Sequence, residues 1–310
     1  MSRERPITSI RAENLRVNYG NLAALKIEEL EISGNVIALV GHNGSGKSTF
    51  LKTLLGLASS SNGNLHASIN SRNLIPENDM AFSPETGAIF ADISVEDYLK
   101  LWCRLKRKDP TFYFEKGQQI IQSLSISDLL GKLGRQLSKG QKRRVQIAAC
   151  LLIEPKLQVF DEPFDGLDIQ QAASLADTVN SQLHDTSILL SSHRMDVVER
   201  LADSIIMLER GEVIASGPTS GISAKLRCKG FGLLHENLEN SPNRQLISHL
   251  TQRFPKGVIQ FVGSQVNLAG IDLSREKIES SLQSLNLKNY RIEEYTPSFS
   301  DAVHVRQKLL

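Results

Sequence analysis

The stretch NVIALVGHNGSGKST, which starts at Asn35, restricts the fold of this 310-residue chain more than any other part of the sequence. Its first half is a β-branched apolar run, typical of a buried strand, and a glycine-rich turn and a helical segment follow directly. Gly41, Gly44 and Gly46 would let the backbone approach an anion closely and direct its N–H groups toward it. The order strand, glycine-rich turn, helix therefore predicts an α/β core with the P-loop layout.

Two side chains of this turn supply the chemistry that a bound nucleotide needs. Lys47 would place a positive charge at the β- and γ-phosphates, and the Ser48 hydroxyl would bind Mg²⁺. Asn43 and Thr49 complete the predicted nucleotide-binding turn. The other interpretation is a flexible glycine-rich turn with a lysine placed by chance, and the strand in front of the turn argues against it.

A second strand, LQVFDEP from Leu157 to Pro163, ends in two acids. Ligands bind at the edge of a parallel sheet where the carboxyl ends of its strands lie, so both acids should face the phosphates. Asp161 would hold Mg²⁺ through water, and Glu162 would be the general base that orients and polarises the attacking water. A solvated acidic strand end is the ordinary alternative, and the P-loop makes it the weaker one.

The segment LSKGQKRRVQIAACLL, from Leu137 to Leu152, lies between the two strands and predicts a polar turn that opens an amphipathic helix. It resembles the signature of ATP-binding cassette proteins, and the neighbouring motifs follow in the order of that family. The resemblance implies that Tyr19 stacks on adenine, that the D-loop FDGLD brings Asp168 to the nucleotide, and that His193 contacts the γ-phosphate. Each motif alone has an ordinary explanation, such as a solvated helix face for Lys142 to Arg144. Their shared order and spacing indicate an ATP-hydrolysing cassette.

The signature has an implication for assembly. In the family, the positions of Ser138, Gly140 and Gln141 bind the nucleotide held by another cassette, where a helix start favours an anion. This chain has one set of motifs, so the resemblance implies a head-to-tail pair, most simply a homodimer, around two molecules of MgATP. Lys139 stands where the family more often has glycine, which should alter affinity at most.

Glu85, in the stretch FSPETGAIF from Phe82, stands where the family usually has glutamine. That glutamine reaches Mg²⁺ and the attacking water and links the core to the helices. A carboxylate keeps the metal-binding oxygen but loses the amide donor, and it adds repulsion toward the γ-phosphate. Glu85 should therefore retune the nucleotide and metal site without abolishing hydrolysis. Proline followed by glutamate here also resembles cassettes of the drug- and antibiotic-exporter group.

The motifs divide the chain into two expected domains. Residues 1–216 should form the nucleotide-binding domain, with a mixed sheet, an antiparallel β-subdomain and an α-helical subdomain inserted at about residues 86–150. Residues 217–310 carry no cassette motif and should form a small α+β domain. Its PSFSDAV segment, from Pro297, partly resembles the tail of the same exporter group. This domain would either steady the dimer or hold a regulatory ligand.

Composition limits the partners. The formal charge of +2 is spread evenly along the chain, which does not favour nucleic acid as a partner. Three cysteines without a CxxC pair indicate a reducing compartment, and the apolar runs are shorter than a membrane span. We therefore expect a cytoplasmic subunit, peripheral on the cytoplasmic face of a membrane, that works with a separate integral membrane permease.

Two other classes of cassette ATPase need to be weighed. Those of translation usually carry two cassettes in one chain, and those of DNA repair and chromosome structure interrupt the core with long coiled coils. This chain carries one cassette and has no heptad run between Lys47 and Asp161. The preferred interpretation is the ATPase subunit of a transporter, an exporter by its resemblance. A soluble cassette ATPase of translation or DNA repair is the alternative.

Overall fold

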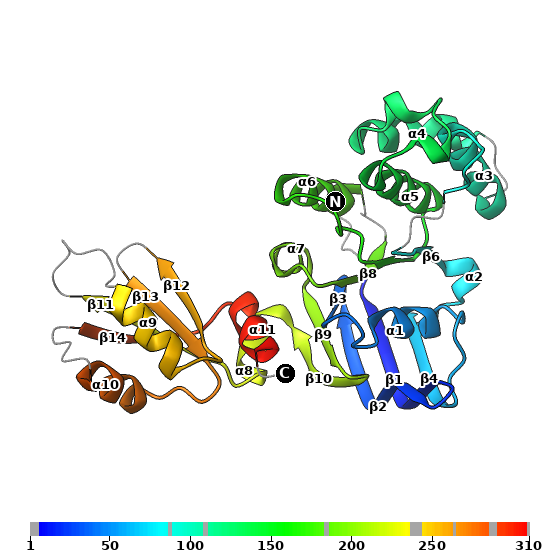
Figure 1. The fold of residues 1–310 in the computed structure, drawn as a ribbon. Coiled ribbons are helices and arrows are strands. Elements are labelled where there is room, and N and C mark those ends of the chain that lie inside the picture. The colour runs from blue at the N-terminus through cyan, green and yellow to red at the C-terminus, as the bar shows by residue number, and fades with distance from the viewer. Residues whose placement is uncertain are drawn as a thin grey trace. The chain divides into compact units, whose positions relative to one another are not determined.

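The computed structural model describes residues 6–85, 89–107, 111–182, 186–235, 244–262, 265–284 and 290–308. It divides into two compact units, residues 1–217 and 218–310, and each is described by itself (Figure 1). The first unit carries all the cassette motifs named above, and the PSFSDAV segment lies in the second. Residues 86–88 and 108–110, which fall in the expected helical subdomain, lie outside the described residues.

The first unit contains a six-stranded sheet in the order β10-β9-β3-β8-β7-β6. Its strands are β3 (Val36–Val40), β6 (Met80–Ser83), β7 (Leu157–Asp161), β8 (Ser187–Ser192), β9 (Ser204–Glu209) and β10 (Glu212–Pro218). The five strands from β9 to β6 pair in parallel. Every residue of β3, β7 and β8 is buried, and β3 is accordingly a continuous apolar run. Parallel pairing brings the carboxyl ends of β3, β7 and β8 to one edge.

A second sheet of the first unit has the order β2-β1-β4-β5 and is antiparallel throughout. Its strands are β1 (Thr8–Tyr19), β2 (Leu22–Gly34), β4 (Asn62–Ile69) and β5 (Arg72–Asn73). Along β1 buried residues such as Ile10, Leu15 and Val17 are separated by exposed ones, as expected for a strand with one face in the core. This sheet is the expected antiparallel β-subdomain.

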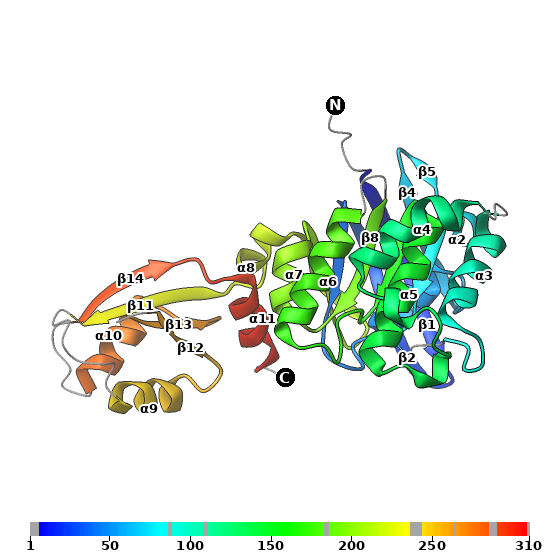
Figure 2. The ribbon, with the colours of Figure 1, turned by 90° about the horizontal axis from the view of Figure 1, so that it is seen from above.

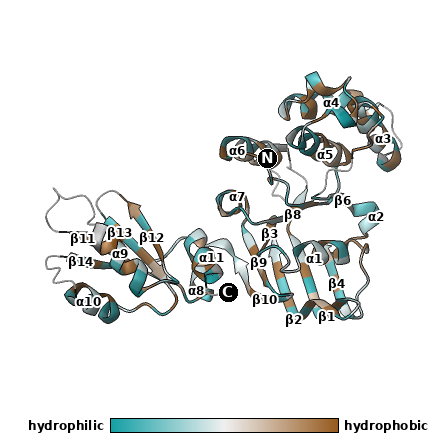
Figure 3. Ribbon diagram, viewed as in Figure 1, coloured by the Kyte–Doolittle hydropathy of each residue, from teal (hydrophilic) through white to brown (hydrophobic). Residues whose placement is uncertain are grey.

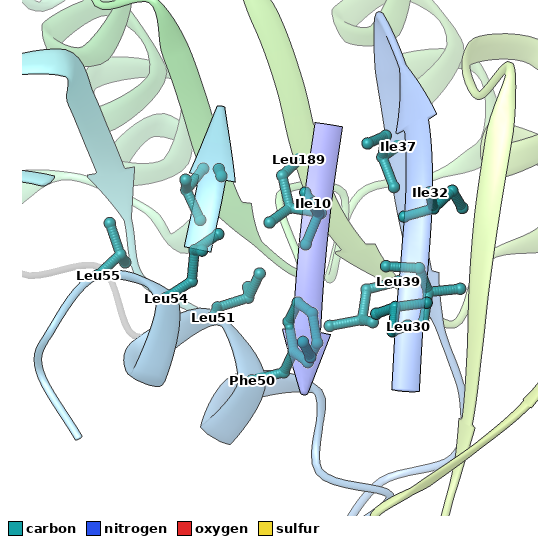
Figure 4. Packing of buried hydrophobic residues seen from close by; sticks show 14 of the residues in the cluster. Ile10, Leu30, Ile32, Ile37, Leu39, Phe50, Leu51, Leu54, Leu55 and Leu189 are labelled. Atoms are coloured by element: carbon teal, nitrogen blue, oxygen red, sulfur yellow. The ribbon is translucent and has the colours of Figure 1, made fainter. Parts of the chain in front are cut away.

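Helix α1 (Lys47–Leu54) packs between the two sheets of the first unit. Figure 4 shows Phe50, Leu51 and Leu54 of α1 pointing toward Ile10 of β1 and toward the strands of the six-stranded sheet. Phe50 and Leu51 are fully buried. Because the apolar face of α1 is held on both sides, the glycine-rich turn that precedes α1 has a rigid base.

Three helices of the first unit gather side by side in Figures 1 and 2: α3 (Val95–Arg107), α4 (Phe112–Ser123) and α5 (Lys139–Ile153). Their ribbons carry both hydrophobic and hydrophilic segments in Figure 3, as amphipathic helices do. The short α2 (Pro76–Asp79) leads into β6, while α6 (Ile169–Gln182) and α7 (Met195–Leu201) pack against each other. The fold of the first unit is the expected mixed α/β core with helices inserted between β6 and β7.

In its described residues, the second unit has a four-stranded antiparallel sheet in the order β12-β13-β11-β14 and four α-helices. The chain order β11 (Lys229–His235), α9 (Arg244–Arg253), β12 (Val258–Val262), β13 (Gln265–Gly270), α10 (Arg275–Ser284) and β14 (Tyr290–Tyr295) is a split β-α-β arrangement. Helices α8 (Ile222–Lys225) and α11 (Phe299–Gln307) flank it in the sequence. Phe231, Leu250 and Leu268 belong to its separate hydrophobic core. This is the α+β fold expected from the sequence.

Candidate functional site: a nucleotide cavity

The glycine-rich turn, residues 41–46, connects the end of β3 to the start of α1. Gly44 and Gly46 have φ angles of 81° and 106°, in the left-handed region that favours glycine. A Cβ atom on Gly41 would lie 2.4 Å from the carbonyl oxygen of Leu208, so this position has no room for a side chain. The turn therefore wraps closely around the first N–H groups of α1, which have no partner within the helix.

Lys47 lies folded back over this turn. Its Nζ donates to the carbonyl oxygens of Gly41 and His42, at 2.8 and 3.0 Å. It also forms an ion pair with Glu162 Oε1 at 3.4 Å, and both side chains are more than nine-tenths buried. A buried positive charge is thus already held next to the place where phosphates would enter.

Glu162 follows directly on β7 and has a φ angle of 47°, which is rare for a residue with a side chain. Ser191 of β8 holds this turn: its Oγ accepts from Glu162 N at 2.8 Å and donates to Asp161 Oδ1 at 2.6 Å. The Glu162 carboxylate reaches His193, whose Nδ1 lies 2.9 Å from Oε2. The register of β7 and β8 therefore fixes both acids and the histidine at one edge of the sheet.

These residues surround one cavity of about 600 Å³, a size typical of small-molecule sites. Most of the predicted site residues line it, from the end of β1, the glycine-rich turn, the loop after β6, β7 and the loop after β8. They are Tyr19, Asn43, Gly44, Gly46, Lys47, Ser48, Thr49, Glu85, Glu162 and His193. Tyr19 is 52% exposed, as a stacking ring at a cavity mouth would be.

The other predicted site residues lie elsewhere. Gly41 and Asp161 do not line the cavity: Gly41 O accepts from Lys47 Nζ, and Asp161 Oδ1 accepts from the Ser191 hydroxyl. Asp168 Oδ1 accepts from Gln171 N at the start of α6. Ser138, Gly140 and Gln141 line a second cavity of about 430 Å³ beside α4 and α6. The signature residues and the glycine-rich turn of one chain thus belong to different cavities.

Ser138 and Gln141 form a capping box at the start of α5. Ser138 Oγ accepts from Gln141 N at 3.2 Å, and Gln141 Oε1 accepts from Ser138 N at 2.9 Å. Lys139, between them, donates to Asp165 Oδ2 at 2.6 Å. This hydrogen bond holds the pKa of Asp165 below its ordinary value, and burial opposes it. Lys139 therefore lies along the D-loop of its own chain.

Several cavity residues were not predicted from the sequence: Leu22, Ala23, Ala24, Asp165 and Arg210. Asp165 lies inside FDGLD, so that motif was the available signal. The others come from β2 and from the turn between β9 and β10, where the sequence has no pattern typical of nucleotide binding. Gly211, in the turn beside Arg210, joins these segments, because its N donates to Ser45 O and its O accepts from Lys26 N.

Arg143 corrects the ordinary explanation of the basic cluster on α5. A solvated helix face does not describe it, because its side chain is only 3% exposed. Its guanidinium donates to the carbonyl oxygens of Pro84 and Glu85. The helical spacing of the sequence alone could not show that two free carbonyl groups lie above this face.

The cavity suits a nucleotide with Mg²⁺. The turn at Gly41 has the tight shape of a phosphate cradle, and Glu162 Oε1 is a buried acceptor without a hydrogen bond among the described residues. The described residues hold no cluster of three or more His, Cys, Asp or Glu side chains placed for a metal. Mg²⁺ takes only one or two protein ligands when phosphates and water supply the rest, so the Ser48 hydroxyl and a nearby carboxylate are sufficient.

Comparison with known proteins agrees with this geometry. Residues 29–165 match the family model described as ABC transporter. The chain is 28% identical over 297 residues to the uncharacterized ABC transporter ATP-binding protein YhaQ of Bacillus subtilis, covering 93% of this chain and 95% of YhaQ. It is 33% identical over 212 residues to the molybdenum import ATP-binding protein ModC of Bordetella pertussis, covering 64% of this chain and 56% of ModC.

A solved structure of an ATP-binding subunit of an ABC transporter has a TM-score of 0.61 and 28% identity, covering 70% of this chain and 92% of the other. Within the described residues, no helix combines the length and the apolar character needed to cross a bilayer. Cassettes of this kind bind ATP, dimerise and work with membrane permeases. Residues 29–165 therefore form a domain of the ABC transporter family, and the chain as a whole is similar to the ATP-binding cassette ATPases of that family.

Proposed function

We propose that this chain is the ATP-hydrolysing subunit of an exporter, that it forms a homodimer around two molecules of MgATP, and that it drives a separate permease from the cytoplasmic face of a membrane. The observation that carries the proposal is the meeting of Lys47, Glu162 and His193 in one cavity with the Ser48 hydroxyl. Transfer of a phosphoryl group to water needs a positive charge at the phosphates, a general base and a ligand for the metal ion.

Each group has a defined role in this proposal. Lys47 neutralises charge on the β- and γ-phosphates, and Tyr19 stacks on the base. Glu162 accepts the proton of the attacking water, and His193 orients the Glu162 carboxylate and contacts the γ-phosphate. Mg²⁺, held by Ser48 with Asp161 and Glu85 nearby, supplies charge neutralisation when it is bound.

The placement of the signature supports the proposed homodimer. Ser138 and Gly140 line a cavity different from that of Lys47, so a second copy can bring its signature to the nucleotide. The helix start at Ser138 suits a phosphate oxygen, because the first N–H groups of α5 and its dipole favour an anion.

Mixing two inactive variants tests the composite site. Lys47→Ala and Ser138→Arg should each abolish ATP hydrolysis as pure homodimers. An equal mixture forms heterodimers with one intact site, so about a quarter of the wild-type rate should return if both copies contribute to each site. Absence of any recovery, with heterodimers present by native mass spectrometry, contradicts the composite site.

The permease would bind in a groove of about 450 Å³ between β6 and helices α3 and α5. Its walls include Pro84, Trp102 and Cys150, with more apolar than polar surface. Ser83 Oγ and Gln146 Oε1 line it too, and both are buried without a hydrogen bond among the described residues. An amphipathic helix of the permease, with apolar side chains and one or two polar groups, fits this groove.

Capture from native membranes tests the partner. The tagged chain should bring down an integral membrane protein in stoichiometric amount after gentle solubilisation, and a charge placed at an exposed position of the groove, such as Leu57→Glu, should release it. Ribosomal or DNA-repair proteins in place of a membrane protein would support the alternative of a soluble cassette ATPase.

Export is supported by the Pro84–Glu85 pair and by PSFSDAV, both of which resemble the drug-exporter group. The similarity to ModC, named for molybdenum import, is a reason to test the direction. In inside-out vesicles that contain the captured permease, external ATP should drive its cargo into the lumen. ATP-driven loss of preloaded cargo from these vesicles would indicate import.

A further inference from the structure

A buried arginine connects helix α5 to the loop that carries Glu85. Arg143 Nη1 donates to Pro84 O at 2.8 Å, and Arg143 Nη2 donates to Glu85 O at 2.6 Å. The two terminal nitrogens of the planar guanidinium therefore bind adjacent carbonyl groups of one loop. Such charge-assisted, two-pronged contacts fix geometry better than a single neutral hydrogen bond.

Burying the Arg143 guanidinium is costly, so other groups must compensate for its charge. Arginine is rarely buried without compensation, and Arg143 is only 3% exposed. Burial lowers its pKa, while the carboxylates of Asp165 and Glu85 favour its charged form. The acids of the nucleotide cavity thus balance the guanidinium, which in turn holds the loop.

Arg143 connects two functional parts of the chain, the nucleotide cavity and the helix that follows the signature serine. Glu85 lines the nucleotide cavity, whereas α5 begins at Lys139, directly after the signature serine. A continuous helix of 15 residues transmits displacement along its length as a rigid body. A shift at the signature end of α5 would therefore pull the backbone of Glu85, and with it the carboxylate at the nucleotide.

We infer that Arg143 is a positioning residue that sets the Glu85 carboxylate in the nucleotide cavity according to the position of α5. The inference rests on the proposed role of Glu85 near the nucleotide. It assigns to Arg143 a function that acts through Glu85 and has no direct contact with the reacting atoms.

Substitution in two backgrounds tests this. Arg143→Lys keeps the charge but loses the planar guanidinium and its two separate donor nitrogens, so kcat should fall roughly tenfold or more, with KM for ATP changed less than about threefold. In a Glu85→Ala background the same substitution should change kcat less than about twofold, because no carboxylate is left to position. Where turnover is too slow for a steady-state assay, the single-turnover rate of ATP hydrolysis with enzyme in excess gives the same comparison.

Arg144 provides a matched control on the same helix. Its Nη1 also donates to two carbonyl oxygens, those of Leu124 and Ser125, at 3.3 and 3.2 Å, but at the end of α4. Arg144→Lys should change kcat by the same factor whether residue 85 is Glu or Ala. If Arg143→Lys does not fold, as judged by urea unfolding, Arg143→Gln replaces it, since it keeps one donor group.

Equal effects of Arg143→Lys in both backgrounds would overturn the inference, since Arg143 would then act independently of Glu85. This outcome is distinct from failure of the proposed function. In that case the wild-type chain would show no ATP hydrolysis that depends on Lys47, whatever residue stands at 143.

Discussion

Replacement of Glu162 by glutamine should tighten ATP binding while it stops hydrolysis. Lys47 Nζ and Glu162 Oε1 lie 3.4 Å apart, and both side chains are more than nine-tenths buried. At an effective dielectric constant of 20, the attraction at this separation is about 5 kcal/mol. The phosphates of bound ATP must share Lys47 with the Glu162 carboxylate, and they place further negative charge close to that carboxylate.

The net gain is smaller than the raw attraction. Desolvation offsets much of the energy of a buried ion pair, and Lys47 keeps its bonds to two backbone carbonyl groups in the variant. A gain of about 1–2 kcal/mol is reasonable, which corresponds to roughly 5- to 30-fold tighter binding of ATP. Loss of the general base should lower kcat by about 10²- to 10⁴-fold, so an ATP-bound dimer should accumulate.

Equilibrium titration with ATP in EDTA, where neither protein hydrolyses it, measures the affinity. Glu212→Gln is the matched control, because Glu212 pairs with Lys26 at 3.1 Å on the exposed surface and should leave the affinity unchanged. Unchanged or weaker ATP binding by Glu162→Gln would refute the idea that the carboxylate competes for Lys47. Undiminished turnover would overturn the assignment of Glu162 as the base.

Three other substitutions test separate features. Glu85→Gln should keep phosphate release within about tenfold of wild type, since both side chains offer an oxygen to the metal, and complete loss of activity would contradict this. Gly46→Ala should lower the free energy of unfolding by about 1–3 kcal/mol and weaken ATP binding, because the residue has a φ of 106° and its Cβ would meet a neighbouring atom at 2.8 Å. An unchanged urea midpoint would count against this. The hydrogen bond from Ile75 N and the ion pair with Lys156 lower the pKa of Asp79 below 3.8. The stabilisation they give is therefore present above the unfolded pKa and lost as pH falls through the folded one. Asp79→Asn should cost about 1–2 kcal/mol at pH 7, and the difference from wild type in urea unfolding should shrink below about pH 4.

Local parts of the fold were predictable because their determinants are contiguous. The strand β3, the turn and α1 need only an apolar run, glycines with φ above zero and a helical segment, and all three stand within 20 residues. Likewise β7 ends at Asp161 because an apolar run stops there in two acids. The antiparallel hairpin β12–β13 could be read from alternation.

The remaining parts depend on contacts between distant segments. Arg210 enters the nucleotide cavity because the turn between β9 and β10 bonds to β2 and to the glycine-rich turn, a contact with no local pattern. Arg143 is buried because the loop after β6 presents two carbonyl groups to it. Helical periodicity places both Arg143 and Arg144 on a polar face, and only the tertiary structure separates them.

The capping box at the start of α5 influences which ions the signature can bind. The Ser138 oxygen already accepts a hydrogen bond from Gln141 N, yet the hydroxyl still holds its own hydrogen. That hydrogen can be donated to a bound ligand, together with the backbone N–H groups of the helix start. A phosphate oxygen can accept from all of these donors, whereas an ammonium group has no lone pair with which to accept. The capping box at the start of α5 therefore also favours a negatively charged ligand.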